Sequence, residues 1–275
     1  MTKLRGVRAR IGCAGRTDVG RLRSTNEDSL LMSPESGVFV VADGVGGRAA
    51  GDVASEMAVR LLTRELGVLR NLDDVQARER MRFAVRAANE AIFQCTLAEP
   101  DKRGMGTTVT GLAIYGARFL VGHVGDSRCY LLREASLTPI TRDHSFVQEQ
   151  VDAGYLTLGD AFVHPYRSVI TRCVGVNLDV VPDIYGGPVQ AGDVFLLASD
   201  GLTGMLDDHQ IAEVLSPVRR PRDQVEDLIA MANKEGGRDN ITALVVRVDA
   251  IDEPAYAARR TMATSTLRPR PFTHV

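Results

Sequence analysis

The sequence predicts an α+β fold in which antiparallel sheets pack together and are covered by helices. Strand-like runs follow one another over 108–133 and return at 193–199 and 241–248, while helical patterns come in pairs between these groups. Strict alternation of strands and helices would instead indicate a parallel sheet. The 275 residues are enough for one large domain with a substantial core.

The first strand is predicted at 38–42, where the β-branched run VFVVA ends at Asp43 and glycines follow. Apolar residues then recur at helical spacing between 53 and 62, and again between 81 and 92, which predicts two successive helices. A loop over 101–106 follows the second helix.

Three further strands are predicted at 108–115, 118–124 and 127–133. Tight turns at 116–117 and 125–126 join them, a pattern typical of an antiparallel meander.

The polar stretch 143–172 is predicted to form a mobile flap. Helical patterns at 208–215 and around 225–232 lie between the last two strands. The apolar pattern stops after Asp249, so we expect a domain over 1–249 and a disordered basic tail over 250–275.

Composition narrows the functional classes. A net charge of −2 gives no strong field towards nucleic acid or membranes, and the absence of Trp disfavours base stacking. No apolar run approaches the roughly 20 residues of a membrane span, and no apolar core follows the basic N-terminus as in a secretory signal. The four cysteines form no C-x-x-C pair. We therefore expect a cytoplasmic protein with reduced thiols, no membrane span and no nucleic-acid partner.

Acidic residues recur at the ends of the apolar runs. Asp43 ends VFVVA, Asp200 ends FLLAS, and Asp239 stands directly before the last strand. Glu27 and Asp28 form a further acidic pair upstream of the first strand.

Such carboxylates would repel one another at a shared sheet edge unless cations neutralised them. Oxygen ligands select Mg²⁺ or Mn²⁺, and the five histidines show no H-E-x-x-H spacing that would indicate zinc. Arg23, close to the acidic pair, suits bidentate binding of a phosphate dianion. A plain surface charge is the alternative interpretation of Arg23.

Eight short motifs follow one another between residue 17 and residue 248. They are, in chain order, TDVGRLRSTNED, VADGVGG, GMGTT, VGDSR, TRDHS, HPYRSVITR, ASDGL and RDNIT. Their order resembles the metal-dependent protein phosphatases of the type 2C or PPM class, and the compact form resembles bacterial members that oppose eukaryotic-like serine/threonine kinases.

The resemblance implies a four-layer α/β/β/α sandwich with two central antiparallel sheets and a site for two Mn²⁺ or Mg²⁺ ions. Asp43 would bridge both ions, and Gly44 would offer its carbonyl to one of them. Asp200 and Asp239 would complete the first ion, and Glu27 would contribute to the second.

The resemblance also implies roles around these ions. Asp28 would orient bound water without being a ligand, and Arg23 would bind the substrate phosphate. Asp126, together with Asp200, matches a position that holds a third metal in bacterial relatives. Residues 145–168 match the flap beside the site in the family.

One position departs from the family pattern. Some members carry a histidine general acid directly after the D-G pair, where this chain has Val45. Protonation of the leaving alkoxide then falls to water on the metals or to another group such as His144, and water is preferred.

The resemblance thus implies hydrolysis of phosphoserine and phosphothreonine in phosphorylated proteins, including a Ser/Thr kinase and its substrates. Two alternatives stay open. Residues 44–49 satisfy G-x-G-x-x-A and Glu65 follows, as in dinucleotide-binding proteins, although Asp43 would repel a pyrophosphate. A phosphatase fold without activity would serve as a binding module, but such a chain should have lost its metal ligands.

Overall fold

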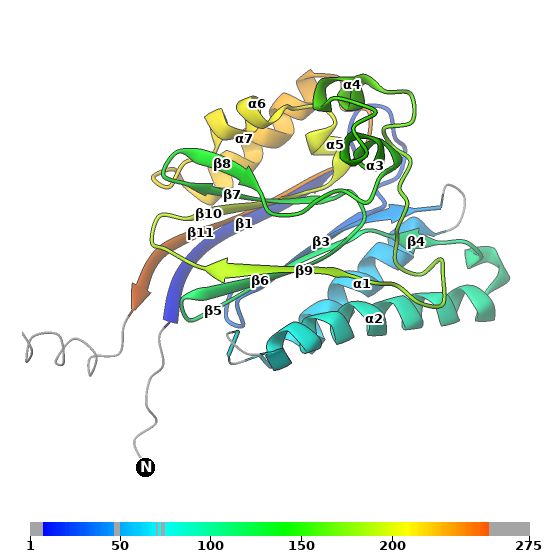
Figure 1. Cartoon of the computed structure of the whole chain (residues 1–275), viewed down its shortest axis with the longest axis horizontal. Coiled ribbons are helices and arrows are strands. Elements are labelled where there is room, and N and C mark those ends of the chain that lie inside the picture. The colour runs from blue at the N-terminus through cyan, green and yellow to red at the C-terminus, as the bar shows by residue number, and fades with distance from the viewer. Residues whose placement is uncertain (1–7, 47–49, 70, 73–74, 253–275) are drawn as a thin grey trace, which may run out of the picture.

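Two antiparallel sheets lie face to face with helices on both outer sides (Figure 1). The computed structural model describes residues 8–46, 50–69, 71–72 and 75–252. The predicted α+β class and the four-layer α/β/β/α sandwich are confirmed.

The first sheet is covered by the C-terminal helices. Its strand order is β1-β11-β10-β7-β8, and neighbouring strands in it pair antiparallel. The strands are β1 (Arg8–Asp18), β7 (Arg128–Arg133), β8 (Ser136–Pro139), β10 (Val194–Ala198) and β11 (Ile241–Asp252), and the helices are α5 (Asp200–Thr203), α6 (Asp208–Val214) and α7 (Pro221–Lys234).

The second sheet has the order β2-β3-β5-β6-β9, with the short β4 paired to β3. Helices α1 and α2 cover its outer face (Figure 1). The strands are β2 (Asp28–Ser33), β3 (Val38–Val45), β4 (Gly106–Thr107), β5 (Val109–Tyr115), β6 (Arg118–Val124) and β9 (Asp183–Pro188), and the helices are α1 (Gly51–Leu66), α2 (Val75–Ala98) and the 3₁₀ turn η1 (Pro100–Lys102).

The run VFVVA is apolar throughout because β3 is covered on both faces. Val38 and Val40 pack into the core under α1 and α2, whereas Phe39 and Val41 pack into the core between the sheets. The period of two is therefore present in the structure but hidden in the sequence, since both faces call for apolar side chains.

The predicted meander over 108–133 is wrong in its second half. β5 and β6 form the expected hairpin, but β7 belongs to the other sheet and pairs with β10. At the crossing, Gly125 has φ +112°, and a Cβ there would lie 2.6 Å from the Thr108 side chain. The segment 125–127 is thus a crossover between sheets, and Asp126 stands on it.

Besides the two-residue β4, sequence reasoning missed the strands β1, β2, β8 and β9, which are the four edge strands of the two sheets. Edge strands are less enclosed than central strands, so their residues need not be apolar. In β1, for example, arginines and glycines stand between the packed residues, and most positions are only partly buried.

The flap contains α3 (Phe146–Asp152) and α4 (Leu158–Val163). Its two ends are joined, because the Phe146 N–H donates to the Val169 carbonyl at 2.8 Å and the Thr171 N–H donates to the His144 carbonyl at 2.7 Å.

The C-terminal boundary differs slightly from the prediction. β11 continues to Asp252 and so includes the first residues of the predicted tail, while 253–275 lie outside the described residues. In the described part of the chain, none of the helices combines the length and apolarity needed to cross a membrane.

Candidate active site

The candidate site lies at one end of the gap between the two sheets. Asp43 is part of β3, which continues to Val45 beyond the predicted end at 42, and it lies opposite Asp28 in the β2–β3 register. The Asp43 N–H donates to the Thr108 hydroxyl at 2.9 Å, and the Asp43 carbonyl accepts from the Thr108 N–H at 2.8 Å. These bonds fix the backbone that carries the Asp43 carboxyl group.

Asp200 is the first residue of α5, directly after β10, and lies beside the Asp239–Asn240 segment. A Cβ on Gly201 would meet the Asn240 carbonyl oxygen at 1.9 Å and the Asp239 Cβ at 3.3 Å. Glycine at this position therefore allows the two loops that carry Asp200 and Asp239 to approach each other.

Asn240 fastens the loop of residues 19–27 to the start of β11. Its Oδ1 accepts from the Glu27 N–H at 2.8 Å, and its Nδ2 donates to the carbonyls of Val19 at 3.0 Å and Thr25 at 2.9 Å. This loop holds Glu27 and Arg23. Asn240 was not singled out from the sequence, although it follows Asp239 directly in R-D-N.

Arg23 reaches the acidic residues across this loop. Its Nη2 lies 2.7 Å from Asp239 Oδ2, and this hydrogen bond raises the pKa of Arg23. Burial raises the pKa of Glu27, whereas the Arg23 charge lowers it. Arg23 therefore lies beside the carboxylates. A plain surface charge would not need this position.

The electrostatics show that acidic residues from distant segments meet here. Burial raises the pKa of Asp43 well above its usual value, and the charges of Asp28, Asp200, Asp126 and Asp239 raise it further. Burial and then the Asp239 charge raise the pKa of Asp200, which accepts a hydrogen bond from Asp43. Burial also raises the pKa of Asp126, with a contribution from Asp200.

Asp28 lies deeper than the other carboxyl groups and is 6% exposed. The hydroxyls of Ser199 and Thr242 donate to its Oδ2 at 2.7 and 2.6 Å, while its Oδ1 has no hydrogen-bond partner among the described residues. Burial raises the pKa of Asp28 to about 7. A buried oxygen without a partner calls for a ligand or bound water.

The residues fit divalent cations in their chemistry, since they offer oxygen donors whose burial and mutual repulsion a cation would offset. As the side chains stand, no three His, Cys, Asp or Glu residues within the described ranges form a ready ligand group. Asp239 is paired with Arg23, and Asp43 shares a hydrogen bond with Asp200. Cation binding would replace both contacts.

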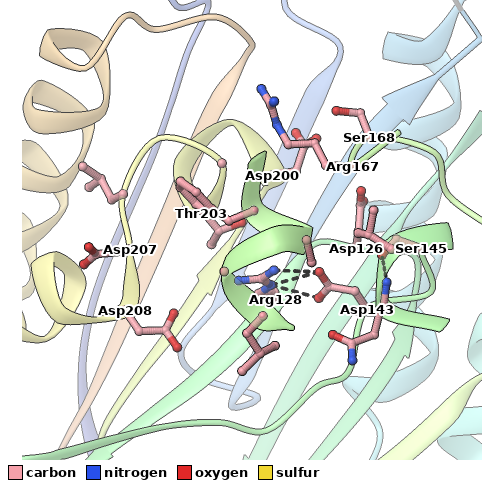
Figure 2. Close-up of a pocket in the computed structure, with 18 residues that line it drawn as sticks. Asp126, Arg128, Asp143, Ser145, Arg167, Ser168, Asp200, Thr203, Asp207 and Asp208 are labelled. Carbon is pink, nitrogen blue, oxygen red and sulfur yellow. Dashed lines mark hydrogen bonds and ion pairs between the residues drawn. The ribbon is translucent and has the colours of Figure 1, made fainter. Parts of the chain in front are cut away.

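A cavity of about 440 Å³ adjoins Asp126 and Asp200 and separates the flap from α5 and α6 (Figure 2). Arg167 of the flap lies on the same side of the view as these two aspartates. The sequence interpretation gave Arg167 no role, because an arginine in a polar stretch carries no distinguishing signal.

His144 does not face this cavity as a free acid. It is 3% exposed, its Nδ1 accepts from the Gly125 N–H at 3.1 Å, and its Nε2 lies 3.1 Å from Asp183 Oδ2. Both ring nitrogens are thus engaged in structural contacts. This geometry does not present His144 as a general acid to the cavity.

The dinucleotide-binding alternative does not agree with the sheet. β3 continues through Gly44 to Val45, and its neighbours β2, β4 and β5 are all antiparallel to it. A dinucleotide site requires a parallel βαβ unit. Residues 47–49 of that motif lie outside the described residues.

Comparison with known proteins agrees with this geometry. Residues 21–245 match the family model described as Protein phosphatase 2C. The chain belongs to the protein phosphatase 2C family. It is a metal-dependent phosphoprotein phosphatase of the serine/threonine class.

The relatives are bacterial phosphatases. The serine/threonine phosphatase Stp of Listeria monocytogenes is 38% identical over 240 residues, which cover 85% of this chain and 94% of Stp. PstP of Mycobacterium tuberculosis is 40% identical over 86% of this chain but only 44% of PstP.

Two solved structures illustrate the similarity in fold. The catalytic domain of PstP in complex with two manganese ions has a TM-score of 0.78 and 37% identity, covering 88% of this chain and 99% of that one. Stp1 of Staphylococcus aureus has a TM-score of 0.82 and 28% identity, covering 91% of this chain and 100% of that one.

Proposed function

We propose that this phosphatase binds two Mn²⁺ or Mg²⁺ ions between its sheets and hydrolyses phosphoserine and phosphothreonine in proteins. The observation that carries the proposal is the contact between the half-buried Asp43 and Asp200, beside Asp239, with raised pKa values. Acids in contact have a clear use when cations bind them. When bound, the ions supply an activated water and neutralise charge on the phosphoryl group.

The proposed ligands come from four segments. Asp43 would contact both ions, with Asp200 and Asp239 on one of them and Glu27 and the Gly44 carbonyl on the other. Close packing supports this use of Gly44, because a Cβ there would lie 2.3 Å from the Gly51 carbonyl oxygen.

Two further acidic residues complete the proposed site. A third ion would lie between Asp126 and Asp200, whose charges act on each other. Asp28, held by Ser199 and Thr242, would orient water towards the ions through its unpartnered oxygen.

Arg23 would grip the phosphoryl oxygens of the substrate in a bidentate manner once Asp239 turns to a cation. Protonation of the serine or threonine alkoxide would fall to water. Val45 cannot donate a proton, and His144 is engaged by Gly125 and Asp183.

The proposed partners are phosphorylated proteins, among them a serine/threonine kinase and the substrates of that kinase. The names of the bacterial relatives support this class of substrate. The proposed location is the cytoplasm, which agrees with four cysteines that are all free thiols.

The test is hydrolysis of p-nitrophenyl phosphate and of a phosphothreonine peptide with Mn²⁺ and with EDTA. We expect activity only with the metal, and we expect Asp43→Asn and Asp239→Asn to abolish it. Glu213→Gln, at an exposed position of α6, serves as the matched control. Near-wild-type rates in either aspartate variant would refute the metal assignment.

A further inference from the structure

The cavity beside Asp126 and Asp200 has a second pair of aspartates at its other end. Figure 2 shows Asp126, Asp200 and Arg167 on one side of it and Asp207 and Asp208 on the other. Its volume of about 440 Å³ falls within the range of ligand-binding pockets, roughly 300–1,000 Å³. The cavity is therefore a compartment continuous with the catalytic centre and large enough for a side chain of the substrate.

The flap supplies an apolar wall to this cavity. Leu158 and Phe162 line it, yet they are 72% and 47% exposed. Val147 and Ala161 extend the same wall, and Leu206, between α5 and α6, also lines the cavity. Such a surface can pack against the aliphatic stem of a long side chain.

The basic residue in the middle of the cavity is already neutralised. Arg128 donates to Asp143 from Nε at 2.9 Å and from Nη2 at 2.8 Å. Its Nη1 donates to the Tyr130 hydroxyl at 3.0 Å, and that hydroxyl donates to Asp208 Oδ1 at 3.0 Å. Arg128 therefore does not offset the charge of the outer carboxylates directly.

The outer end keeps two exposed carboxylates. Asp207 caps α6, since its Oδ1 accepts from the Gln210 N–H at 2.8 Å, and Asp208 accepts from Tyr130. Neither forms an ion pair with a basic side chain in the part of the chain that the structure describes. This end of the cavity therefore carries uncompensated negative charge.

We propose that this cavity is a specificity subsite that binds an arginine close in sequence to the phosphorylated residue of the substrate. The stem would pack on Leu158 and Phe162, and the guanidinium would pair with Asp207 and Asp208. The inference rests on the proposed function, because it needs the phosphoryl group at the Asp43–Asp200 end. An acidic neighbour would be repelled from the same place.

The test compares phosphothreonine peptides that differ only near the phosphorylated residue. Each peptide carries a single Arg, Ala or Glu at one of the three positions on either side, and kcat/KM is measured with Mn²⁺. At one of these positions we expect the Arg peptide to exceed the Ala peptide by about tenfold, equivalent to about 1.4 kcal/mol, and the Glu peptide to be the poorest.

Two variants remove the charge and keep the local hydrogen bonds. Asp207→Asn retains a good N-cap for α6, and Asp208→Asn retains an acceptor for the Tyr130 hydroxyl. In the double variant we expect the ratio of Arg to Ala peptide to fall to about one. Glu213→Gln, on the same helix but outside the cavity, should keep the wild-type ratio.

The outcomes separate this inference from the proposed function. If no peptide is hydrolysed with Mn²⁺, the proposed function fails, and the inference fails with it. If all peptides are hydrolysed equally, or if the double variant keeps the arginine preference, the inference alone is overturned. A preference for Ala over Arg in the wild-type protein would also overturn it.

Discussion

At the scale of single residues, the Arg23–Asp239 ion pair joins two residues that are 216 positions apart in the sequence. The side chains are 52% and 35% exposed, and pairs with such exposure contribute at most about 1 kcal/mol to stability. The pair is better explained by function. In the proposed function, Arg23 would hold Asp239 while the site is open, and each of the two groups would have another partner when substrate and cations bind.

Replacing Arg23 with Ala should raise KM for p-nitrophenyl phosphate by about tenfold, as expected for the loss of a charge-assisted contact worth about 1.5–3 kcal/mol. We expect kcat to change less, because the grip on the phosphoryl group is already made in the bound ground state. Steady-state kinetics with Mn²⁺ in excess provide the measurement. Arg21→Ala in the same loop is the control, and an unchanged KM in Arg23→Ala would remove Arg23 from the site.

At the scale of elements, His144 connects the flap to the crossover between the sheets. Its N–H donates to the Gly125 carbonyl at 2.7 Å, and its Nδ1 accepts from the Gly125 N–H at 3.1 Å. Its carbonyl accepts from Thr171 at the far end of the flap, and its Nε2 faces Asp183 of β9. Since Nδ1 accepts, the neutral ring carries its proton on Nε2, and burial lowers the pKa of His144. The residue after Gly125 is Asp126, so His144 positions that carboxylate as well as the flap.

Two substitutions separate the contacts of the His144 ring. His144→Asn keeps an acceptor near the place of Nδ1 for Gly125, whereas His144→Gln keeps a polar group near the place of Nε2 for Asp183. If the hold on the Gly125–Asp126 turn matters, His144→Gln should weaken Mn²⁺ binding at the proposed Asp126–Asp200 position by about tenfold, or about 1.4 kcal/mol. His144→Asn should retain most of it.

Calorimetric titration with Mn²⁺ measures this binding independently of turnover. The melting temperatures of the two variants control for a general loss of structure. Equal Mn²⁺ affinities in the two variants, together with equal melting temperatures, would contradict the positioning role of His144.

The same element scale shows what the sequence could reveal. Central strands such as β3 and β10 were predictable because both faces are buried, which leaves long apolar runs. The edge strands were not, because their less enclosed positions need not be apolar, and the crossover at Asp126 was not, because pairing with a distant strand leaves little local signal. β7 illustrates this, since its partners β10 and β8 include one that lies more than 60 residues away.

The candidate site was predictable in part for a similar reason. Acidic residues at strand ends stand out against apolar runs, so Asp43, Asp200 and Asp239 could be chosen from the sequence. Asn240 acts through hydrogen bonds to the 19–27 loop, and Arg167 lies at the cavity through the fold of the flap. Contacts of that kind depend on tertiary structure and have no periodicity.

At the scale of the whole molecule, the acidic cluster opposes folding when no cation is bound. Burial raises the pKa of Asp28 to about 7 and raises the pKa values of Asp43, Asp126 and Asp200 as well. A pKa that is higher in the folded than in the unfolded state gives stability that is present at low pH and lost as the pH rises through the folded value. For Asp28 this loss runs from about pH 4 to about pH 7 with an upper limit of about 4 kcal/mol, of which roughly 1.4 kcal/mol falls above pH 6. The metal-free protein should therefore become less stable between pH 6 and pH 8.

Cations should reverse this trend, because they bind the ionised carboxylates that the metal-free fold disfavours. We expect the melting temperature with Mn²⁺ to exceed that with EDTA by a margin that grows from pH 6 to pH 8 and reaches several degrees, at about 2–4 °C per kcal/mol for a domain of this size. His123 titrates in the opposite sense, since burial lowers its pKa to about 3. Its contribution cancels in the difference between the two conditions.

The Asp43→Asn variant tests directly whether repulsion among the carboxylates lowers the stability of the metal-free protein. Removing one buried charge from the cluster should raise the melting temperature of the EDTA-treated protein at pH 8, while the gain from Mn²⁺ should largely disappear. Scanning calorimetry with and without the metal, at pH 6 and pH 8, measures both effects. Glu213→Gln should behave as the wild type under all four conditions. A metal-free Asp43→Asn protein that is less stable than the wild type at pH 8 would contradict this prediction. The carboxylate would then contribute to folding in its own right, and repulsion among the acidic residues would not limit the stability of the metal-free protein.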